Sequence, residues 1–382
     1  MIYFDNAATT YPKPEEVYSF MDRFYRECGV NIGRGQHKLA NQASNLLEET
    51  KSMIKELLGA GNKEVVFTPS ATESLNIVLR GLPWNRHSVV YITPFEHNSV
   101  LRVLYHLQKI YDIDIRELSV NKITLEYEID KIKYLFQEHH PDVVVMSHAS
   151  NMCGLIAPIK DICDMAKRYS AITVVDMAQT AGLIPISLSS IKTDYAIFAA
   201  HKMLYGSFGL GGILMDKNST LKPFLYGGSG LNSASRDVPE TIPERFEIGS
   251  QNIQAIAALN AALKWIAVQG IDNIYNKEKQ YTKKMINLLS KYSNITIIGH
   301  RSENSNIGVI SCVFDGYSSD NIGQVLNQHN IAVRTGLQCA PLAHKFFGTF
   351  PGGTVRFSIG FFNTETDLNK LTEALDYIEL NG

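Results

Sequence analysis

Two segments of this sequence end a run of apolar residues with a side chain that can do chemistry. Ile172-Thr173-Val174-Val175-Asp176 ends in an acid, and Tyr195-Ala196-Ile197-Phe198-Ala199-Ala200-His201-Lys202 ends in a lysine. A lysine amine can form an imine with an aldehyde, and an acid at the end of a buried strand needs a partner, such as a protonated pyridine nitrogen. Each segment also has a plainer interpretation, because aspartate often caps a helix and lysine usually lies on the surface.

Two further segments offer polar groups to the same site. Thr68-Pro69-Ser70-Ala71-Thr72-Glu73 has small hydroxyl residues where a strand passes into a helix, and free N–H groups at such a position bind phosphate. Ser70 and Glu73 also fit a capping box, which needs no ligand. Asn151 follows the apolar run 143–146 and either donates a hydrogen bond to a ring substituent or forms a turn.

The elements that must position these residues alternate between strands and helices. We expect strands over 65–67, 88–92, 142–146, 172–176 and 195–198, with helices over 73–80 and 98–110. Helices over 251–268, 272–292, 319–329 and 365–380 and strands over 295–298, 308–314 and 354–359 follow. This order predicts an α/β protein with a mostly parallel sheet in a large domain (13–254) and a smaller α+β domain (1–12 and 255–382). Ligands of such sheets gather at the carboxyl ends of the strands.

Composition excludes several classes of function. With 45% hydrophobic residues, 19% charged residues and a formal net charge of −2, the chain is typical of globular proteins and has no basic field for nucleic acid. No apolar run approaches the ~20 residues of a membrane helix, and the first residues lack the pattern of a signal peptide. The five cysteines form no CxxC pair. We therefore expect no disulfide framework, no metal site and a cytoplasmic location.

In type and order, these segments resemble class V aminotransferases of the fold-type I pyridoxal-phosphate (PLP) enzymes. The resemblance is closest to the cysteine desulfurase and selenocysteine lyase branch, and it extends from 3–10 (Tyr-Phe-Asp-Asn-Ala-Ala-Thr-Thr) to 356–364 (Arg-Phe-Ser-Ile-Gly-Phe-Phe-Asn-Thr). It implies that Lys202 carries PLP as a Schiff base and that Asp176 pairs with the ring nitrogen. The roles that it implies for other residues are ring stacking and acid–base catalysis for His97, contacts to the ring for Asn151 and Gln179, and a phosphate cradle for Ala71, Thr72 and His201.

The same resemblance implies a homodimer. Ser250, in Phe246-Glu247-Ile248-Gly249-Ser250, matches a hydroxyl residue that reaches the phosphate of the neighbouring subunit's cofactor. The active sites would then be shared between two copies of the chain.

Two C-terminal residues distinguish desulfuration from transamination. Cys339 lies in a loop flanked by Gly336 and Pro341, and by resemblance it is the nucleophile that takes sulfur from the substrate. A free cysteine is more often a buried small apolar residue, but the glycine and proline around this one argue against burial in a core. Arg356 lies on an expected strand, and its planar guanidinium suits a substrate carboxylate. The short interval between the two resembles the branch with a compact cysteine loop.

Three positions depart from the family pattern. Ala199 stands where a serine often helps to hold the phosphate, Gln338 stands where close relatives have a histidine before the cysteine, and Gly33 occupies a further histidine position. Asn31 and Arg34 of that last segment are retained as substrate-binding positions. Losing imidazoles removes general acids, so slow turnover or a different substrate is expected.

The resemblance therefore predicts that L-cysteine is converted to L-alanine, with sulfur passing to Cys339 as a persulfide. The alternatives are a selenocysteine lyase or other amino-acid β-lyase, and a class V aminotransferase. A sulfur-acceptor protein is an expected partner; nucleic acid and membrane are not.

Overall fold

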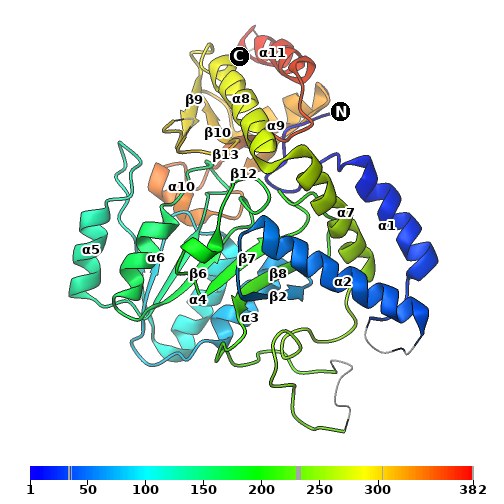
Figure 1. The fold of residues 1–382 in the computed structure, drawn as a ribbon. Helices are drawn as coiled ribbons and strands as arrows, with labels where there is room; N and C mark the ends of the chain where they lie inside the picture. The colour runs from blue at the N-terminus through cyan, green and yellow to red at the C-terminus, as the bar shows by residue number, and fades with distance from the viewer. Residues whose placement is uncertain (33–34, 36, 229–233, 303, 381–382) are drawn as a thin grey trace.

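A seven-stranded sheet, in the order β2-β8-β7-β6-β5-β3-β4, dominates the lower half of the protein (Figure 1). The computed structural model describes residues 1–382 except 33–34, 36, 229–233, 303 and 381–382. Strand β8 runs antiparallel to both of its neighbours, β2 and β7, and the other pairs of adjacent strands in this sheet are parallel. The strands are β2 (Lys63–Thr68), β3 (Val89–Ile92), β4 (Asp114–Glu117), β5 (Val143–Ser147), β6 (Ile172–Asp176), β7 (Tyr195–Ala199) and β8 (Gly211–Asp216).

Helices cover both faces of this sheet. One face packs against α1 (Glu15–Cys28), α2 (Lys38–Leu57), α5 (Ile129–Glu138), α6 (Ile159–Lys167) and α7 (Ile253–Gln269). The other face packs against α3 (Ala71–Gly81) and α4 (Asn98–Tyr111). The fully buried strands β5 and β7 are continuous apolar runs because both of their faces are covered.

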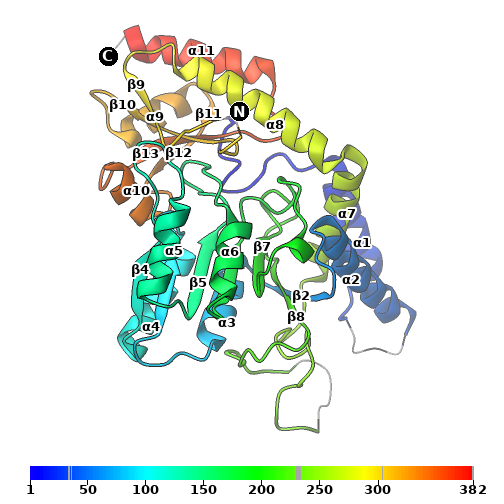
Figure 2. The same ribbon diagram turned by 60° about the vertical axis from the view of Figure 1, so that its left-hand side comes forward.

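A smaller sheet in the order β12-β13-β10-β9 lies above the large one, together with both chain ends (Figure 2). Its strands are β9 (Ile295–Ile298), β10 (Val309–Phe314), β12 (Arg334–Gly336) and β13 (Thr354–Ser358). The helices of this part are α8 (Ile271–Leu289), α9 (Ser319–Gln328), α10 (Pro341–Phe347) and α11 (Glu365–Leu380). The N-terminal strand β1 (Ile2–Tyr3) pairs in parallel with β11 (Ile331–Ala332) in a separate two-stranded sheet, and a bridge from Asp5 to Ser358 joins the first residues to β13.

The strands and helices expected from the sequence are present, with ends that differ by a few residues. The sequence patterns did not predict β8, because its glycines are uncommon in strands. At Gly212 a Cβ atom would lie 2.4 Å from the ring of Phe198, so close packing against β7 requires glycine there. Helices α2, α5 and α10 and strands β1, β4, β11 and β12 were also not predicted, and α1 and α6 were indicated only as helical patterns around Cys28 and Cys163, without bounds.

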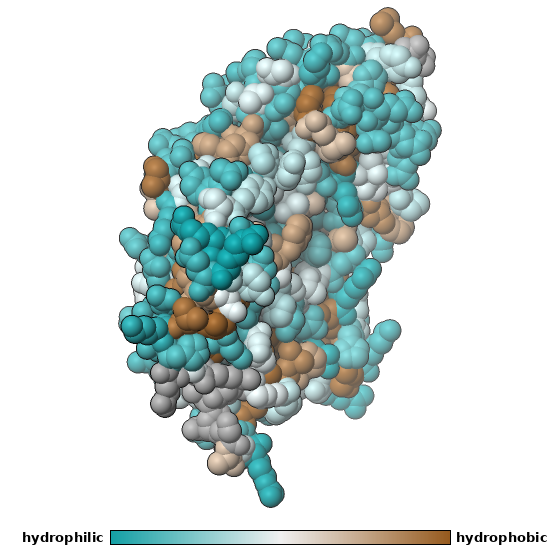
Figure 3. Space-filling view, turned by 90° about the vertical axis from the view of Figure 1, so that its right-hand side faces the viewer, coloured by the Kyte–Doolittle hydropathy of each residue, from teal (hydrophilic) through white to brown (hydrophobic). Residues whose placement is uncertain are grey.

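The division into a large domain (13–254) and a small domain (1–12 and 255–382) remains a proposal. Helix α7 follows the proposed boundary, yet it packs against α1 and α2 in the core of the large sheet, so the two proposed domains share that core. On the face seen in Figure 3, apolar residues form small separate groups among polar ones. Within the described part of the chain, no helix has both the length and the apolar character needed to cross a membrane.

Glu278 of α8 connects the upper part of the protein to the segment that follows Lys202. The hydroxyl of Tyr205 donates a hydrogen bond of 3.1 Å to Glu278 Oε1, and both side chains are buried. Oε2 has no partner among the described residues. Burial raises the pKa of Glu278 to about 8, so the carboxyl group is protonated at neutral pH.

We expect Glu278→Gln to remove a pH dependence of stability. The ordinary pKa of 4.5 rises to about 8 in the folded chain, so the folded state binds the extra proton between these values. The stabilisation that this proton gives to the folded state is fully present below pH 4.5 and is lost as pH rises through about 8. Between pH 4.5 and about 8, the native protein should therefore lose unfolding free energy relative to the variant as pH rises. The loss should be up to about 1.4 kcal/mol per pH unit.

Urea unfolding at several pH values measures this difference, with the exposed Glu379→Gln on α11 as the matched control. A difference between Glu278→Gln and the native protein that stays constant with pH would contradict the assignment.

Candidate active site

A cavity of about 270 Å³ opens at the carboxyl edge of the large sheet. Strands β2, β3, β5, β6 and β7 all end there, and the lower edge of the small sheet closes it from above. Of the residues predicted from the sequence, it is lined by Ala71, Thr72, His97, Asn151, Asp176, Gln179, His201, Lys202, Cys339 and Arg356. The fold therefore brings together side chains that lie up to 285 positions apart in the chain (356 − 71).

Three predicted residues are not among those that line this cavity. Asn31 is exposed. Ser250 is also exposed and lines a different pocket beside Thr68 and Glu247. Arg34 lies outside the described residues, as does Gly33.

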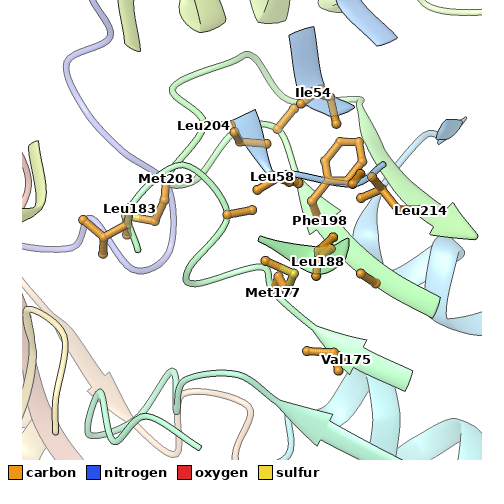
Figure 4. Close-up of a cluster of buried hydrophobic side chains, with 14 of the residues drawn as sticks. Ile54, Leu58, Val175, Met177, Leu183, Leu188, Phe198, Met203, Leu204 and Leu214 are labelled. Carbon is orange, nitrogen blue, oxygen red and sulfur yellow. The ribbon is translucent and has the colours of Figure 1, made fainter. Parts of the chain in front are cut away.

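Apolar neighbours hold Asp176 and Lys202 in place. Val175 and Met177 flank the acid, and Met203 and Leu204 follow the lysine; all four are buried in one cluster (Figure 4). A shift of the backbone at either polar residue would expose these apolar side chains to water, which is unfavourable.

Asp176 is buried, Lys202 is partly buried with its amine inside the cavity, and the two have opposite charge. Asp176 Oδ1 accepts a hydrogen bond of 2.9 Å from the N–H of Ala178. Burial raises the pKa of Asp176, while that bond and Lys202 lower it. Burial lowers the pKa of Lys202, Asp176 raises it, and Arg356 lowers it again. The lysine amine is thus more readily neutral, and therefore more nucleophilic, than an amine in water.

His97 caps α4 with its ring. Nδ1 accepts a hydrogen bond of 3.0 Å from the N–H of Ser99, so the proton of the neutral ring is on Nε2. Burial lowers the pKa of His97 to about 4, with Lys202 and Arg356 adding to the effect. A neutral imidazole with a fixed N–H therefore lines the cavity.

Besides Arg356 Nε, two buried polar atoms in the cavity wall have no partner within the described part of the chain. They are Gln179 Oε1 and His201 Nδ1. Gln179 is held by a bond of 2.9 Å from its Nε2 to the carbonyl of Ala7. The His201 ring stacks on Phe208, with 4.6 Å between the ring centroids. Unpaired buried polar groups are costly, and here they indicate that a polar ligand completes the site.

The start of α3 supplies an anion site at one end of the cavity. Ser70 is the N-cap, as the capping-box interpretation predicted, and its side chain accepts from the N–H of Glu73. The N–H groups of Ala71 and Thr72 precede that position and have no carbonyl partner within the helix. A Cβ atom at Gly211 would lie 2.6 Å from the nitrogen of Ala71, so the glycine lets β8 approach this helix end.

The N-terminal segment clamps the backbone that carries Lys202, which the sequence did not indicate. The carbonyl of His201 accepts hydrogen bonds from Thr9 Oγ1 (2.8 Å) and Lys13 Nζ (2.7 Å), and Thr10 Oγ1 donates to the carbonyl of Lys202 (3.0 Å). Burial lowers the pKa of Lys13 to about 7. These bonds limit movement of the lysine backbone.

Arg356 projects from β13 and is already bonded. Its Nη1 donates to the carbonyl of Asn151 (2.8 Å), and Nη2 forms an ion pair with Asp5 Oδ1 (2.7 Å). Nε is buried without a partner among the described residues. Asp5 is a site residue that sequence reasoning missed. It belongs to the 3–10 segment, but its contact across 351 positions has no local signal.

Cys339 lies on a constrained turn between β12 and α10. Gln338 and Cys339 have φ values of 40° and 59°, a left-handed conformation that non-glycine residues seldom adopt. The turn is fixed by bonds from Asn151 Nδ2 to the carbonyl of Gln338 (2.6 Å) and from the N–H of Asn98 to the carbonyl of Cys339 (2.8 Å). Cys339 is exposed, whereas the other four cysteines are buried.

Comparison with known proteins agrees with this geometry. A model of the family "Aminotransferase class-V" matches residues 2–371. The chain belongs to the class V aminotransferase family. A probable cysteine desulfurase from Pyrococcus abyssi is 31% identical to it, over 98% of this chain and 94% of that protein. Probable cysteine desulfurase 2 from Mycobacterium leprae is 30% identical, over 99% of this chain and 92% of that protein.

Solved structures of the class V family show the same fold. The apo structure of a cysteine desulfurase from Thermococcus onnurineus matches with a TM-score of 0.93 and 28% identity, over 100% of this chain and 95% of that chain. The fold is thus that of the fold-type I PLP enzymes, which confirms the fold and family predicted from the sequence.

Class V enzymes use PLP, and the cavity fits it chemically. A buried amine, a buried acid without a full ion pair, a helix N-terminus and two unpaired polar atoms match an aldehyde, a pyridine nitrogen, a phosphate and ring substituents. At Ala199, a departure from the class V pattern, the wall of the cavity offers no hydroxyl group.

The second departure, Gln338, has a structural role in this chain. Its Nε2 donates to the carbonyl of Thr354 (2.9 Å), and its Oε1 pairs with His344 Nε2 (2.9 Å). His344 is buried, and burial lowers its pKa to about 4, so the imidazole nearest Gln338 is neutral and bonded. Gln338 therefore fastens the cysteine turn to β13 and α10.

We expect Gln338→Ala to destabilise the protein by about 1–3 kcal/mol, because it leaves buried partners on Thr354 and His344 unpaired. The exposed Gln280→Ala on α8 is the matched control and should stay within about 0.5 kcal/mol of the native value. Urea unfolding measures both. Equal stability of the two variants would show that Gln338 does not hold the turn.

Proposed function

We propose that this protein is a PLP-dependent cysteine desulfurase that converts L-cysteine to L-alanine and takes the sulfur onto Cys339 as a persulfide. The observation that carries this proposal is that Cys339, the one exposed cysteine of the five, lines the same cavity as Lys202 and Arg356. Transamination needs no thiol at this position. The similarity to proteins named cysteine desulfurases, at about 30% identity over nearly the whole chain, supports the same reaction.

The chain's residues divide the work of holding the cofactor. Lys202 would bind its aldehyde carbon, Asp176 its ring nitrogen, and Ala71, Thr72 and His201 its phosphate. His97 would stack on the ring, with Asn151 and Gln179 at its edge. When bound, PLP supplies the electron sink that stabilises negative charge at the substrate's Cα.

Arg356 is the residue for the substrate carboxylate. Its guanidinium is buried and fixed by Asn151 and Asp5, and its Nε–H has no partner among the described residues. A carboxylate that enters would bond to Nε and share Nη2 with Asp5, or displace that acid. The fixed guanidinium orients Cα toward Lys202 before any bond changes.

Proton transfers fall to Lys202 and His97. The amine of Lys202, whose pKa burial lowers, takes the proton from Cα and returns a proton later. His97 holds its proton on Nε2, because Nδ1 is occupied by the N–H of Ser99. It can donate that proton as alanine forms and recover it from solvent.

Cys339 performs the sulfur step as a thiolate. Its Sγ attacks the sulfur of the substrate, an S–S bond forms, and the Cβ–S bond breaks. The electron pair of that bond stays on the carbon, which becomes the methyl group of alanine after it takes up a proton. No external oxidant is needed. The carbon keeps both electrons of the Cβ–S bond and is reduced, while the two sulfur atoms that join in the S–S bond are oxidised by the same amount.

The assembly and location proposed from the resemblance fit this reaction. Ser250 is exposed and does not line its own chain's cavity, so it is free to reach the site of a second copy in a homodimer. Asn31 and Arg34 stay substrate-binding residues in this proposal, on the resemblance alone. We propose a cytoplasmic enzyme whose persulfide passes to an acceptor protein.

We expect the protein loaded with PLP to release alanine and sulfide in equal amounts from L-cysteine and a reductant. Cys339→Ala should keep the visible absorbance of bound cofactor and lose at least about tenfold in sulfide release, because the nucleophile is gone. Cys312→Ala, at a buried cysteine, is the control. Normal turnover by Cys339→Ala would refute the persulfide step. A product from selenocysteine alone, or stoichiometric use of a 2-oxo acid, would point to the lyase or the aminotransferase.

We expect PLP to be attached only through Lys202. After borohydride reduction, mass spectrometry should find the cofactor on the peptide that contains Lys202 and on no other. Lys202→Ala should show no attachment, whereas Lys13→Met should retain it, although Lys13 is also partly buried and bonds to the carbonyl of His201. Label on any other lysine in the native protein would overturn the assignment.

A further inference from the structure

One buried carboxyl group beside the cavity takes no part in the proposed reaction. Glu96 is fully buried in the turn between β3 and α4, immediately before His97, and it does not line the cavity itself. In the part of the chain that the structure describes, it forms no ion pair, and the charge that acts on it is the like charge of Asp176. An acid in such a place is costly, so its contacts must compensate.

Both oxygens of Glu96 are bonded to the end of β5. Oε1 accepts a hydrogen bond of 2.8 Å from the N–H of Ser147, and Oε2 accepts one of 2.9 Å from the hydroxyl of the same residue. Oε1 also accepts a bond of 2.6 Å from the hydroxyl of Thr93, in its own turn. The carboxyl group thus joins the β3–α4 turn to β5 through three bonds, which leave neither oxygen unpaired.

The strand end that Glu96 holds belongs to the cavity. Ser147 lines the cavity and lies opposite Asp176 in the parallel pairing of β5 with β6. Burial raises the pKa of Glu96 to about 7; the charge of Asp176 adds to the rise, and the bonds from Thr93 and Ser147 oppose it. The neutral and charged forms of Glu96 are therefore similar in stability near pH 7, so its contacts do not require a full negative charge.

His97 lies between two fixed points of the backbone. On one side Glu96 is bonded to β5, and on the other the N–H of Asn98 donates to the carbonyl of Cys339 (2.8 Å). The ring itself accepts a bond from the N–H of Ser99. The place of the imidazole in the cavity thus depends on bonds to the large sheet and to the cysteine turn.

We propose that Glu96 is a positioning residue, whose side chain fastens the turn that carries His97 to the end of β5 and so sets the imidazole against the bound cofactor. This inference rests on the proposed function, in which His97 stacks on the PLP ring. Glutamate reaches Ser147 and Thr93 at the same time because of its length. The reach of the side chain, rather than its charge, is the property that matters.

Two variants separate reach from charge. Glu96→Gln keeps the length: its Oε1 accepts from Thr93 and from the N–H of Ser147, and its amide nitrogen donates to the hydroxyl oxygen of Ser147. Glu96→Asp keeps the charge but is one methylene shorter, so it cannot bond to both residues unless the turn moves.

The visible circular dichroism of bound PLP measures how the ring is held by its asymmetric surroundings. Per bound cofactor, we expect the signal of Glu96→Asp to fall at least about twofold, because the residues around the ring lose their support. The signal of Glu96→Gln should stay close to the native value.

A similar clamp at the opposite edge of the sheet supplies the control. Asp194 Oδ2 accepts from the N–H (2.7 Å) and from the hydroxyl (3.0 Å) of Thr173, at the start of β6. Asp194→Ala should lower stability in urea and leave the dichroism per bound cofactor unchanged. Thr93→Val removes one bond to Glu96 outside the cavity; it should lower the signal less than Glu96→Asp, and it replaces that variant if the aspartate protein does not fold.

A native signal in Glu96→Asp, or in Thr93→Val where it replaces that variant, would overturn the proposal. A lowered signal in Glu96→Gln would also overturn it, because charge would then be the property that matters. An equal loss in Asp194→Ala would do the same, because the effect would then be one of general stability.

The measurement needs bound PLP but no turnover, so this proposal and the proposed function can fail separately. If L-cysteine gives no alanine while the expected order of signals is found, the proposed function is wrong and the role of Glu96 stands. If alanine and sulfide form and that order is not found, the function stands and the role of Glu96 is wrong.

Discussion

Enclosure of two opposite charges in one cavity, at the ends of neighbouring parallel strands, is the constraint on which the rest of this structure depends. Asp176 ends β6, and Lys202 follows β7 by three residues; the two strands pair in parallel, so both side chains reach the same edge. Neither charge is satisfied as it would be in water, and burial shifts the pKa of each toward its neutral form. Such a pair is costly unless a bound group compensates it, and a ring with a cationic nitrogen and an aldehyde does so at both ends.

The surrounding structure holds these charges where they are. The apolar cluster of Figure 4 anchors the residues on either side of them. The N-terminal segment adds hydrogen bonds from Thr9, Thr10 and Lys13 to the carbonyls of His201 and Lys202. The same segment sends Asp5 to Arg356, so one stretch of chain braces both the cofactor lysine and the arginine of the small sheet. The first residues of the chain thus link the two sheets.

Sequence reasoning found most of the cavity because its residues end buried strands, and such strands are recognisable as apolar runs. Asp176, Lys202 and Asn151 were found in this way, and Cys339 and Arg356 through the family resemblance. The missed residues have no local signal. Asp5 and His344 act through partners distant in sequence or in another element, and Lys13 resembles any surface lysine until its nitrogen is seen on the carbonyl of His201. Gln338 appeared as the loss of an imidazole, whereas the structure shows a side chain that fastens the turn.

The positions of Lys202 and Cys339 reflect two chemical needs that conflict. An amine whose pKa is lowered by burial must be kept from water, whereas a thiol that passes sulfur to another molecule must be reached from outside. The chain meets both needs by placing the amine at the end of a strand of the large sheet and the thiol on a turn beside the small one. The left-handed backbone of Gln338 and Cys339 is strained, and bonds from Asn98 and Asn151, both of the large sheet's connections, hold it in place. The turn therefore depends on the connections of the large sheet for its shape. These contacts keep the thiol beside the cavity while Cys339 remains exposed to solvent.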